Sequence, residues 1–152
     1  FIDPDYANRG GYDPEFLGAT VPLPSVRYKS RLAKLEDGSY LLPYEHFSIA
    51  VEKRRRLALF TASNVDANPL KRQPEPGDYS RRGLSGLGPH DIEQWLTDPR
   101  IPETMQLPDR FYTQDNQAFD KGHIVRRDDV CWGDTYEQVR RANGDTFHTT
   151  NC

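Results

Sequence analysis

The chain is poor in cysteine, in long apolar runs and in net positive charge. Its two cysteines, Cys131 and Cys152, are too few for the disulfide framework of a small secreted domain, and neither belongs to a Cys-X-X-Cys pair. We therefore favour free thiols over a single disulfide, and we expect no structural zinc site. No apolar run approaches the roughly 20 residues of a membrane helix, so a membrane partner is not expected.

The N-terminal residues lack targeting features. The stretch FIDPDYANRG has neither the basic start nor the apolar core of a secretory signal. Together with the scarcity of cysteine, this favours a cytoplasmic location. The chain begins with Phe1 rather than methionine, which indicates a processed or excised part of a longer polypeptide.

Composition fits one loop-rich globular domain. A length of 152 residues suits a single domain, and the 12 prolines and 11 glycines predict long loops between short elements. The net charge of −3 gives no general attraction to nucleic acid. Basic residues nevertheless cluster, and each cluster is either solvated surface or a local phosphate contact. The clusters are Lys53–Arg56, Lys71-Arg72, Arg81-Arg82, Arg126-Arg127 and Arg140-Arg141.

The apolar pattern predicts an irregular arm over residues 1–26, followed by a single domain over residues 27–152 whose elements are short. The Asp37-Gly38 pair between apolar flanks is a hairpin signal. Alternation in HFSIAV and LALFT predicts two antiparallel strands joined by the basic turn Lys53–Arg56. The remaining predicted elements are a helix over 90–98, a helix over 134–143 with Asp134 as cap and Asn143-Gly144 as its end, and a strand over 145–152.

One stretch, FDKGHIVRRDDVCWGD, combines a histidine with nearby cations. Phosphodiester hydrolysis needs a base that deprotonates water and positive charge that neutralises the phosphate oxygens. His123 suits the first role, and Asp120 is placed to fix its tautomer. Lys121, Arg126 and Arg127 are candidates to bind the phosphates on either side of the scissile bond. On these residues alone, a structural histidine in a turn is the favoured interpretation of His123.

The other histidines carry weaker functional signals. His46 begins a predicted strand, His90 follows Gly-Pro in a loop, and His148 alternates within a predicted strand. We interpret all three as packing or surface residues.

The stretch DKGHIVRRDDVCWGD followed by DTFHTTNC closely resembles the DNA/RNA non-specific endonuclease family, which includes the Serratia-type nucleases and endonuclease G. The family signature D-R-G-H reads here Asp120 to His123, and the later T-N pair ends at Asn151. Similarity extends through YEHFSIAVEKRRRLALFTASNVD and WLTDPRIP, and so covers most of residues 40–152.

The resemblance implies an α+β fold with a central antiparallel sheet flanked by helices and a ββα-metal active site. It implies a magnesium-dependent, or manganese-dependent, endonuclease that acts on DNA, RNA or both. His123 would be the general base, with Asp120 and Asn151 also in the catalytic centre. Lys121 stands where the family has arginine, which keeps the charge but loses the planar fork for bidentate phosphate binding.

The family's metal-bearing asparagine lies on a helix beyond the T-N strand, and this sequence ends at Cys152 before that helix. We therefore predict no metal ligand within the chain and a C-terminal fragment or continuation as partner; a homodimer stays open. The alternative hypothesis is a nuclease-derived module that binds nucleic acid or a protein without cutting. Zinc-dependent hydrolysis is disfavoured because the histidines and cysteines have no ligand spacing.

Overall fold

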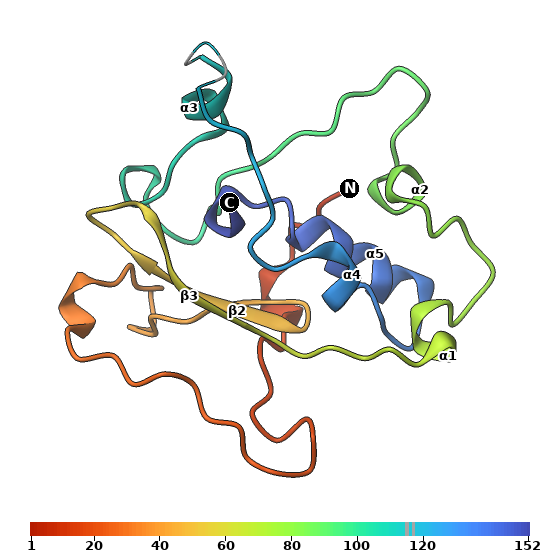
Figure 1. Ribbon diagram of the computed structural model, residues 1–152, viewed down its shortest axis with the longest axis horizontal. Coiled ribbons are helices and arrows are strands. Elements are labelled where there is room, and N and C mark those ends of the chain that lie inside the picture. The colour runs from red at the N-terminus through yellow and green to blue at the C-terminus, as the bar shows by residue number, and fades with distance from the viewer. Residues whose placement is uncertain (115, 117) are drawn as a thin grey trace.

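The computed structural model describes residues 1–114, 116 and 118–152, and shows a small antiparallel sheet with short helices around it (Figure 1). The sheet has three strands in the order β1-β2-β3. They are β1 (Leu42–Tyr44), β2 (Phe47–Glu52) and β3 (Leu57–Ser63), and both pairings are antiparallel. The predicted pair of strands and its basic turn are thus confirmed. In the described part of the chain, no helix is long and apolar enough to cross a membrane.

The helical elements are all short except the last α-helix. The α-helices are α1 (Pro69–Arg72), α2 (Arg81–Ser85), α3 (Asp109–Thr113), α4 (Arg127–Val130) and α5 (Tyr136–Asp145). The 3-10 turns are η1 (Tyr6–Asn8), η2 (Lys29–Arg31), η3 (Glu103–Met105) and η4 (Thr149–Asn151). Helices α2 and α4 both pack on α5. The expected mixed α/β character with a central antiparallel sheet is therefore present.

Strand β2 forms the centre of the core. Every residue of β2 is buried, because its apolar side chains pack toward the helices while the N-terminal arm covers its other face. On that covered face the Ser48 hydroxyl accepts a hydrogen bond from the Tyr12 N–H at 2.9 Å. The main apolar cluster comprises Ala33, Leu42, Tyr44, Phe47, Ile49, Val51, Ile101, Val125 and Val130.

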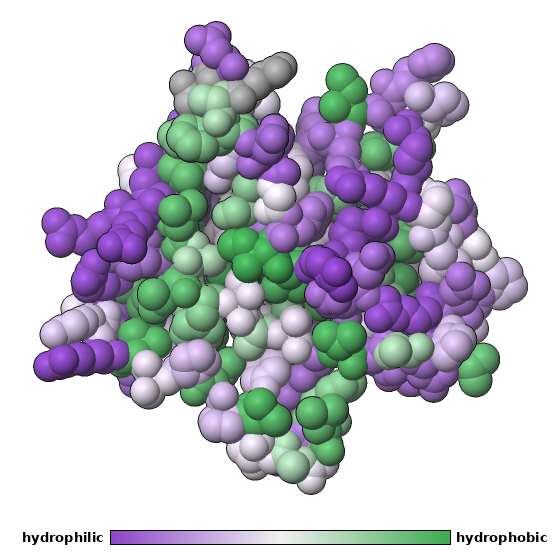
Figure 2. Space-filling model, in the orientation of Figure 1, coloured by the Kyte–Doolittle hydropathy of each residue, from purple (hydrophilic) through white to green (hydrophobic). Residues whose placement is uncertain are grey.

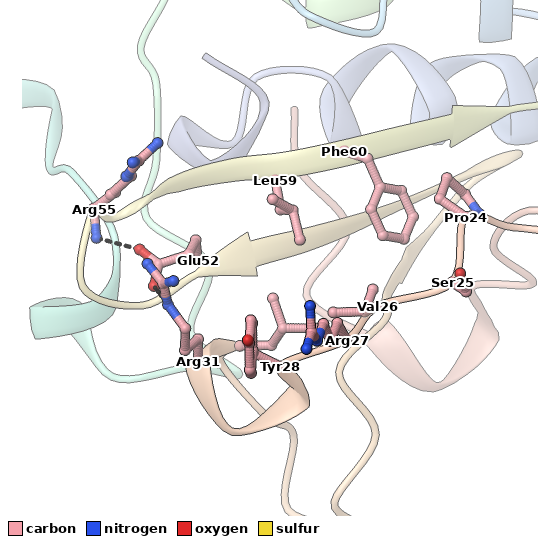
Figure 3. A pocket seen from close by; sticks show the side chains of 11 residues that line it. Pro24, Ser25, Val26, Arg27, Tyr28, Arg31, Glu52, Arg55, Leu59 and Phe60 are labelled. Atoms are coloured by element: carbon pink, nitrogen blue, oxygen red, sulfur yellow. Dashed lines mark hydrogen bonds and ion pairs between the residues drawn. The ribbon is translucent and has the colours of Figure 1, made fainter.

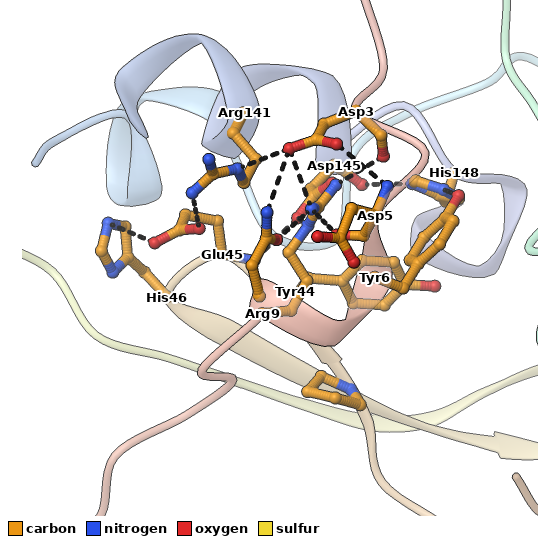
Figure 4. A network of polar contacts seen from close by, with 12 residues as sticks. Asp3, Asp5, Tyr6, Arg9, Tyr44, Glu45, His46, Arg141, Asp145 and His148 are labelled. Carbon is orange, nitrogen blue, oxygen red and sulfur yellow. Dashed lines mark hydrogen bonds and ion pairs between the residues drawn. The ribbon is translucent and has the colours of Figure 1, made fainter. Parts of the chain in front are cut away.

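Residues 1–26 contain only η1 and are held against the domain by a buried ion pair (Figure 4). The Arg9 guanidinium donates to both carboxylate oxygens of Asp145, at 2.7 and 2.9 Å. Neither side chain is exposed to solvent. The Tyr6 hydroxyl also lies 2.7 Å from Nε2 of His148, which is fully buried. These contacts join the arm to the end of α5 and to the segment that follows it.

Two predicted elements are wrong because long-range contacts replace local propensity. Residues 90–98 form no helix; instead Leu96 pairs in a bridge with His148, and the Leu96 N–H donates to the Phe147 carbonyl at 3.0 Å. Residues 145–152 form no continuous strand, because α5 runs through Asn143-Gly144 to Asp145 and the chain then turns into η4.

The helix end and cap also differ from expectation. The N-cap of α5 is Thr135 rather than Asp134, and its hydroxyl accepts from the Gln138 N–H. Asn143 does not stop the helix because its side chain is buried, where it donates to Ser85 and accepts from Arg127. The glycine at 144 serves packing, since a Cβ there would lie 2.3 Å from the Phe1 carbonyl oxygen.

The Asp37-Gly38 signal marks a turn rather than a hairpin of two strands. Gly38 has a φ of +83°, and the Leu35 N–H donates across the turn to the Ser39 carbonyl at 2.8 Å. Residues 1–41 contain no strand, and β1 begins only at Leu42. Both cysteines carry free thiols, as expected, and burial raises the pKa of Cys131 to about 12.

Candidate active site

The loop that carries His123 connects α3 to α4 (Figure 1). Asn151 holds this loop by hydrogen bonds to the two residues that follow His123. The Asn151 carbonyl accepts from the Ile124 N–H at 2.9 Å. Its side-chain amide accepts from the Val125 N–H at 2.8 Å and donates to the Val125 carbonyl at 3.0 Å. Asn151 is fully buried, so it acts on the loop through hydrogen bonds rather than by facing solvent.

The imidazole of His123 lies in an aromatic corner. Its ring centroid is 4.6 Å from that of Trp95 and 4.8 Å from that of Phe147, with the Phe147 ring nearly perpendicular to it. The Nε2 atom of His123 is buried and has no hydrogen-bond partner within the described residues. A buried polar atom without a partner costs about 1–3 kcal/mol, so such an atom needs an explanation.

The surroundings keep the imidazole neutral. Burial is the main cause that lowers the pKa of His123 to about 4, and the positive charge of Arg81 lowers it further. Arg127 acts in the same direction, while Glu93 opposes them. A neutral imidazole at physiological pH has one ring nitrogen free to accept a proton.

Arg81 joins the site from the first turn of α2. Its guanidinium donates to both carboxylate oxygens of Glu93, and its Nε lies 3.1 and 3.0 Å from them. The same guanidinium stacks over the Phe147 ring, 5.3 Å from its centroid. Arg81 therefore places a positive charge, paired with Glu93, next to the aromatic residues around His123.

The predicted phosphate-binding cations diverge in the structure. Lys121 Nζ pairs with Asp109 Oδ1 at 2.5 Å. The Arg126 side chain is 71% exposed and pairs with Asp129. The half-buried Arg127 instead turns toward α5, where its Nε donates to the Asn143 side chain at 2.6 Å. Of these three cations, Arg126 is thus the most exposed beside the loop, whereas the Lys121 side chain is 23% exposed.

Asp120 does not take the orienting position that the sequence suggested. It is exposed, and within the described part of the chain it makes no hydrogen bond to His123. The glycine at 122 has open space where a Cβ would lie, so no neighbour within the described residues requires glycine there.

Sequence reasoning missed four residues around His123. Trp95, Phe147, Arg81 and Glu93 were assigned to a helix, a strand or solvated surface, although they approach the imidazole or its charges. The doubled arginine at 81–82 was the one sequence feature that could have indicated a cation near His123. It was not decisive because the chain has several such pairs and only folding brings one of them to the histidine.

The donor set around His123 does not fit a divalent cation by itself. Magnesium prefers oxygen ligands, whereas the charged groups that act on the imidazole are two arginines and a carboxylate already bound by Arg81. Across residues 1–114, 116 and 118–152, no group of three or more His, Cys, Asp or Glu side chains is placed to hold a metal ion.

Comparison with known proteins identifies the family of the chain. The family model described as DNA/RNA non-specific endonuclease matches residues 27–152, and the chain belongs to that family. The chain is also 32% identical over 158 residues to the uncharacterized protein y4fB of Sinorhizobium fredii. That alignment covers 97% of this chain and 21% of the relative, so the chain spans about a fifth of the relative's length. No solved structure matches.

Proposed function

We propose that this chain provides the general base of an endonuclease that hydrolyses phosphodiester bonds of DNA, RNA or both. Membership of the nuclease family supports this reaction class. The observation that supports His123 as the base is its neutral imidazole, whose buried Nε2 has no partner in the described chain while two arginines lie near enough to lower its pKa.

The proposed step is proton transfer from water to His123. As the water oxygen bonds to phosphorus, a ring nitrogen takes the proton, and the bond from phosphorus to the leaving oxygen breaks. Because Nε2 is buried, the indole of Trp95 or the imidazole must move to admit that water. Arg81 and the exposed Arg126 are the cations proposed to offset the negative charge that builds on the phosphate oxygens.

The family is generally metal-dependent, and magnesium or manganese is the proposed cation. A divalent cation stabilises charge on phosphoryl oxygens when it is bound. Since the described residues around His123 do not form a ligand set for it, we derive no step through the metal. Chelation with EDTA should abolish cleavage, and excess magnesium should restore it.

The decisive experiment compares two histidine variants in the full-length protein. His123→Ala should reduce cleavage of plasmid DNA and total RNA by about 10²- to 10⁴-fold, the usual loss for a general base. His90→Ala is the matched control, because His90 is exposed and outside the site, and it should keep wild-type activity. His123→Ala activity within a few fold of wild type would exclude His123 as the base.

The same experiment separates the alternative function. If wild-type protein binds DNA or RNA but shows no cleavage with any divalent cation, the chain is a nuclease-derived binding module. In that case His123→Ala should leave nucleic-acid binding unchanged as well.

A further inference from the structure

A groove separate from the His123 loop runs between residues 24–31 and the outer strand β3 (Figure 3). It has a volume of about 470 Å³. Its apolar lining comes from both sides: Val26 and Leu32 from the segment before the sheet, and Leu59 and Phe60 from β3. Leu59 is 51% exposed, so a large apolar side chain faces solvent here without cover from the described chain.

The rim of the groove is positively charged. Arg27, Arg31 and Arg55 line it, against Glu52 as the single carboxylate among its lining residues. Arg31 forms an ion pair with Glu52 at 3.2 Å. Within the described residues, the guanidinium groups of Arg27 and Arg55 make no ion pair. This local excess of positive charge contrasts with the chain's net charge of −3.

An exposed aromatic ring lies between these cations. Tyr28 is 56% exposed, and the guanidinium carbon of Arg27 lies 5.2 Å from its ring centroid. On the space-filling surface, hydrophilic side chains gather over the β2–β3 turn next to hydrophobic ones (Figure 2). An aromatic face, an apolar floor and a cationic rim together match the features that bind bases and phosphates of unpaired strands.

We propose that this groove binds a single-stranded segment of nucleic acid, with a base on Tyr28 and the apolar floor and its phosphates on Arg27 and Arg55. The inference rests on the proposed nuclease function and adds a second contact region to it. A duplex fits less well, because its bases are stacked inside and cannot reach Leu59 or Phe60. An acidic peptide would satisfy the arginines but has no flat base for the tyrosine.

The groove would bind a part of the substrate strand that is distant from the reacting phosphate. None of its lining residues belongs to the His123 loop or to the aromatic corner of Trp95 and Phe147. Its contribution should therefore appear in binding of long substrates, as a higher KM when it is damaged, with kcat unchanged.

The test measures binding of a fluorescent oligothymidylate to the full-length protein in EDTA, which separates binding from cleavage. Tyr28→Ala should weaken binding by about tenfold, and Tyr28→Phe, which keeps the ring, should stay within twofold of wild type. Arg55→Ala should reduce the log-log salt slope by about 0.7, the value for one lost single-strand phosphate contact. Arg54→Ala is the matched control, because Arg54 is exposed on the same turn but does not line the groove.

Three results would overturn the inference: equal effects of Arg54→Ala and Arg55→Ala, no effect of Tyr28→Ala, or displacement of the oligonucleotide by polyglutamate as readily as by unlabelled oligothymidylate. Circular dichroism checks that each variant folds, and Tyr28→Leu replaces Tyr28→Ala if the latter does not. Unchanged binding in the groove variants, with cleavage lost in His123→Ala, would reject the groove but keep the proposed function. Weakened binding in the groove variants, with cleavage intact in His123→Ala, would keep the groove as a binding site but reject His123 as the general base.

Discussion

The side-chain amide of Asn151 pairs with both backbone groups of Val125, accepting from the N–H at 2.8 Å and donating to the carbonyl at 3.0 Å. Val125 lies two residues after His123, and both Asn151 and Val125 are buried. The amide thus replaces the strand partner that this stretch of backbone lacks. Through this pairing, a residue 28 positions away in sequence sets the course of the His123 loop.

Asn151→Ala should destabilise the fold and release the loop. It removes the partner of three buried backbone groups, the N–H and carbonyl of Val125 and the carbonyl of Thr146, so we expect a loss of about 2–4 kcal/mol in the free energy of unfolding, measured by urea denaturation. Asn68→Ala removes an exposed amide that only caps α1, and should cost about 1 kcal/mol. Equal losses of unfolding free energy in the two variants would show that the hydrogen bonds of Asn151 to Val125 stabilise the fold no more than an exposed helix cap does.

The pH dependence of cleavage should reflect the lowered pKa of His123. The base works when neutral, so kcat/KM should stay constant from neutral pH down to about pH 5 and fall as the pH passes through about 4. An unperturbed histidine would instead lose activity near pH 6.5.

Arg81→Gln should move this acidic limb to higher pH. The change removes a positive charge that disfavours the imidazolium and leaves Glu93 free to favour it, so both effects raise the pKa of His123. Arg82→Gln, a neighbouring exposed arginine on α2, should leave the limb where it is. A pH–rate profile that is identical in wild type and Arg81→Gln would contradict this electrostatic role.

Arg126 and Arg127 should respond differently to replacement. Arg126→Ala should lower the log-log salt slope for duplex DNA by about 0.9, as expected for one phosphate contact, without changing stability. Arg127→Ala should instead lower the free energy of unfolding by about 1 kcal/mol, because it removes a charged hydrogen bond to Asn143 from a half-buried site. Identical salt slopes and identical unfolding free energies for the two variants would contradict the separate roles of Arg126 in phosphate binding and Arg127 in stability.

The N-terminal arm should be essential for stability through Arg9. Arg9→Met leaves the Asp145 carboxylate buried without its cation, which we expect to cost about 3–5 kcal/mol. Arg141→Met affects a more exposed ion pair with Asp3 and Glu45, and its cost should be smaller. Thermal unfolding of both variants provides the comparison, and a milder effect of Arg9→Met would argue against the buried pair as the anchor of the arm.

Elements with strong local patterns could be predicted, and elements defined by distant partners could not. The alternation in β2 and β3 and the helical face of α5 depend on neighbours within the same segment. Residues 90–98 also have a helical pattern, but backbone pairing of Leu96 with residues 147–149 holds them extended. The end of α5 was misjudged for the same reason, since buried partners of Asn143 override its tendency to stop a helix.

The sequence by itself determined the family, the candidate base and the presence of nearby cations, because the Asp-Lys-Gly-His tetrad and the Thr-Asn pair are contiguous motifs. Only the tertiary structure decided which groups surround His123. Trp95, Phe147 and Arg81 come from three separate segments, and their approach lowers the imidazole pKa by burial and charge. Desolvation and Coulomb interactions depend on distance in space, which a linear order of residues does not encode.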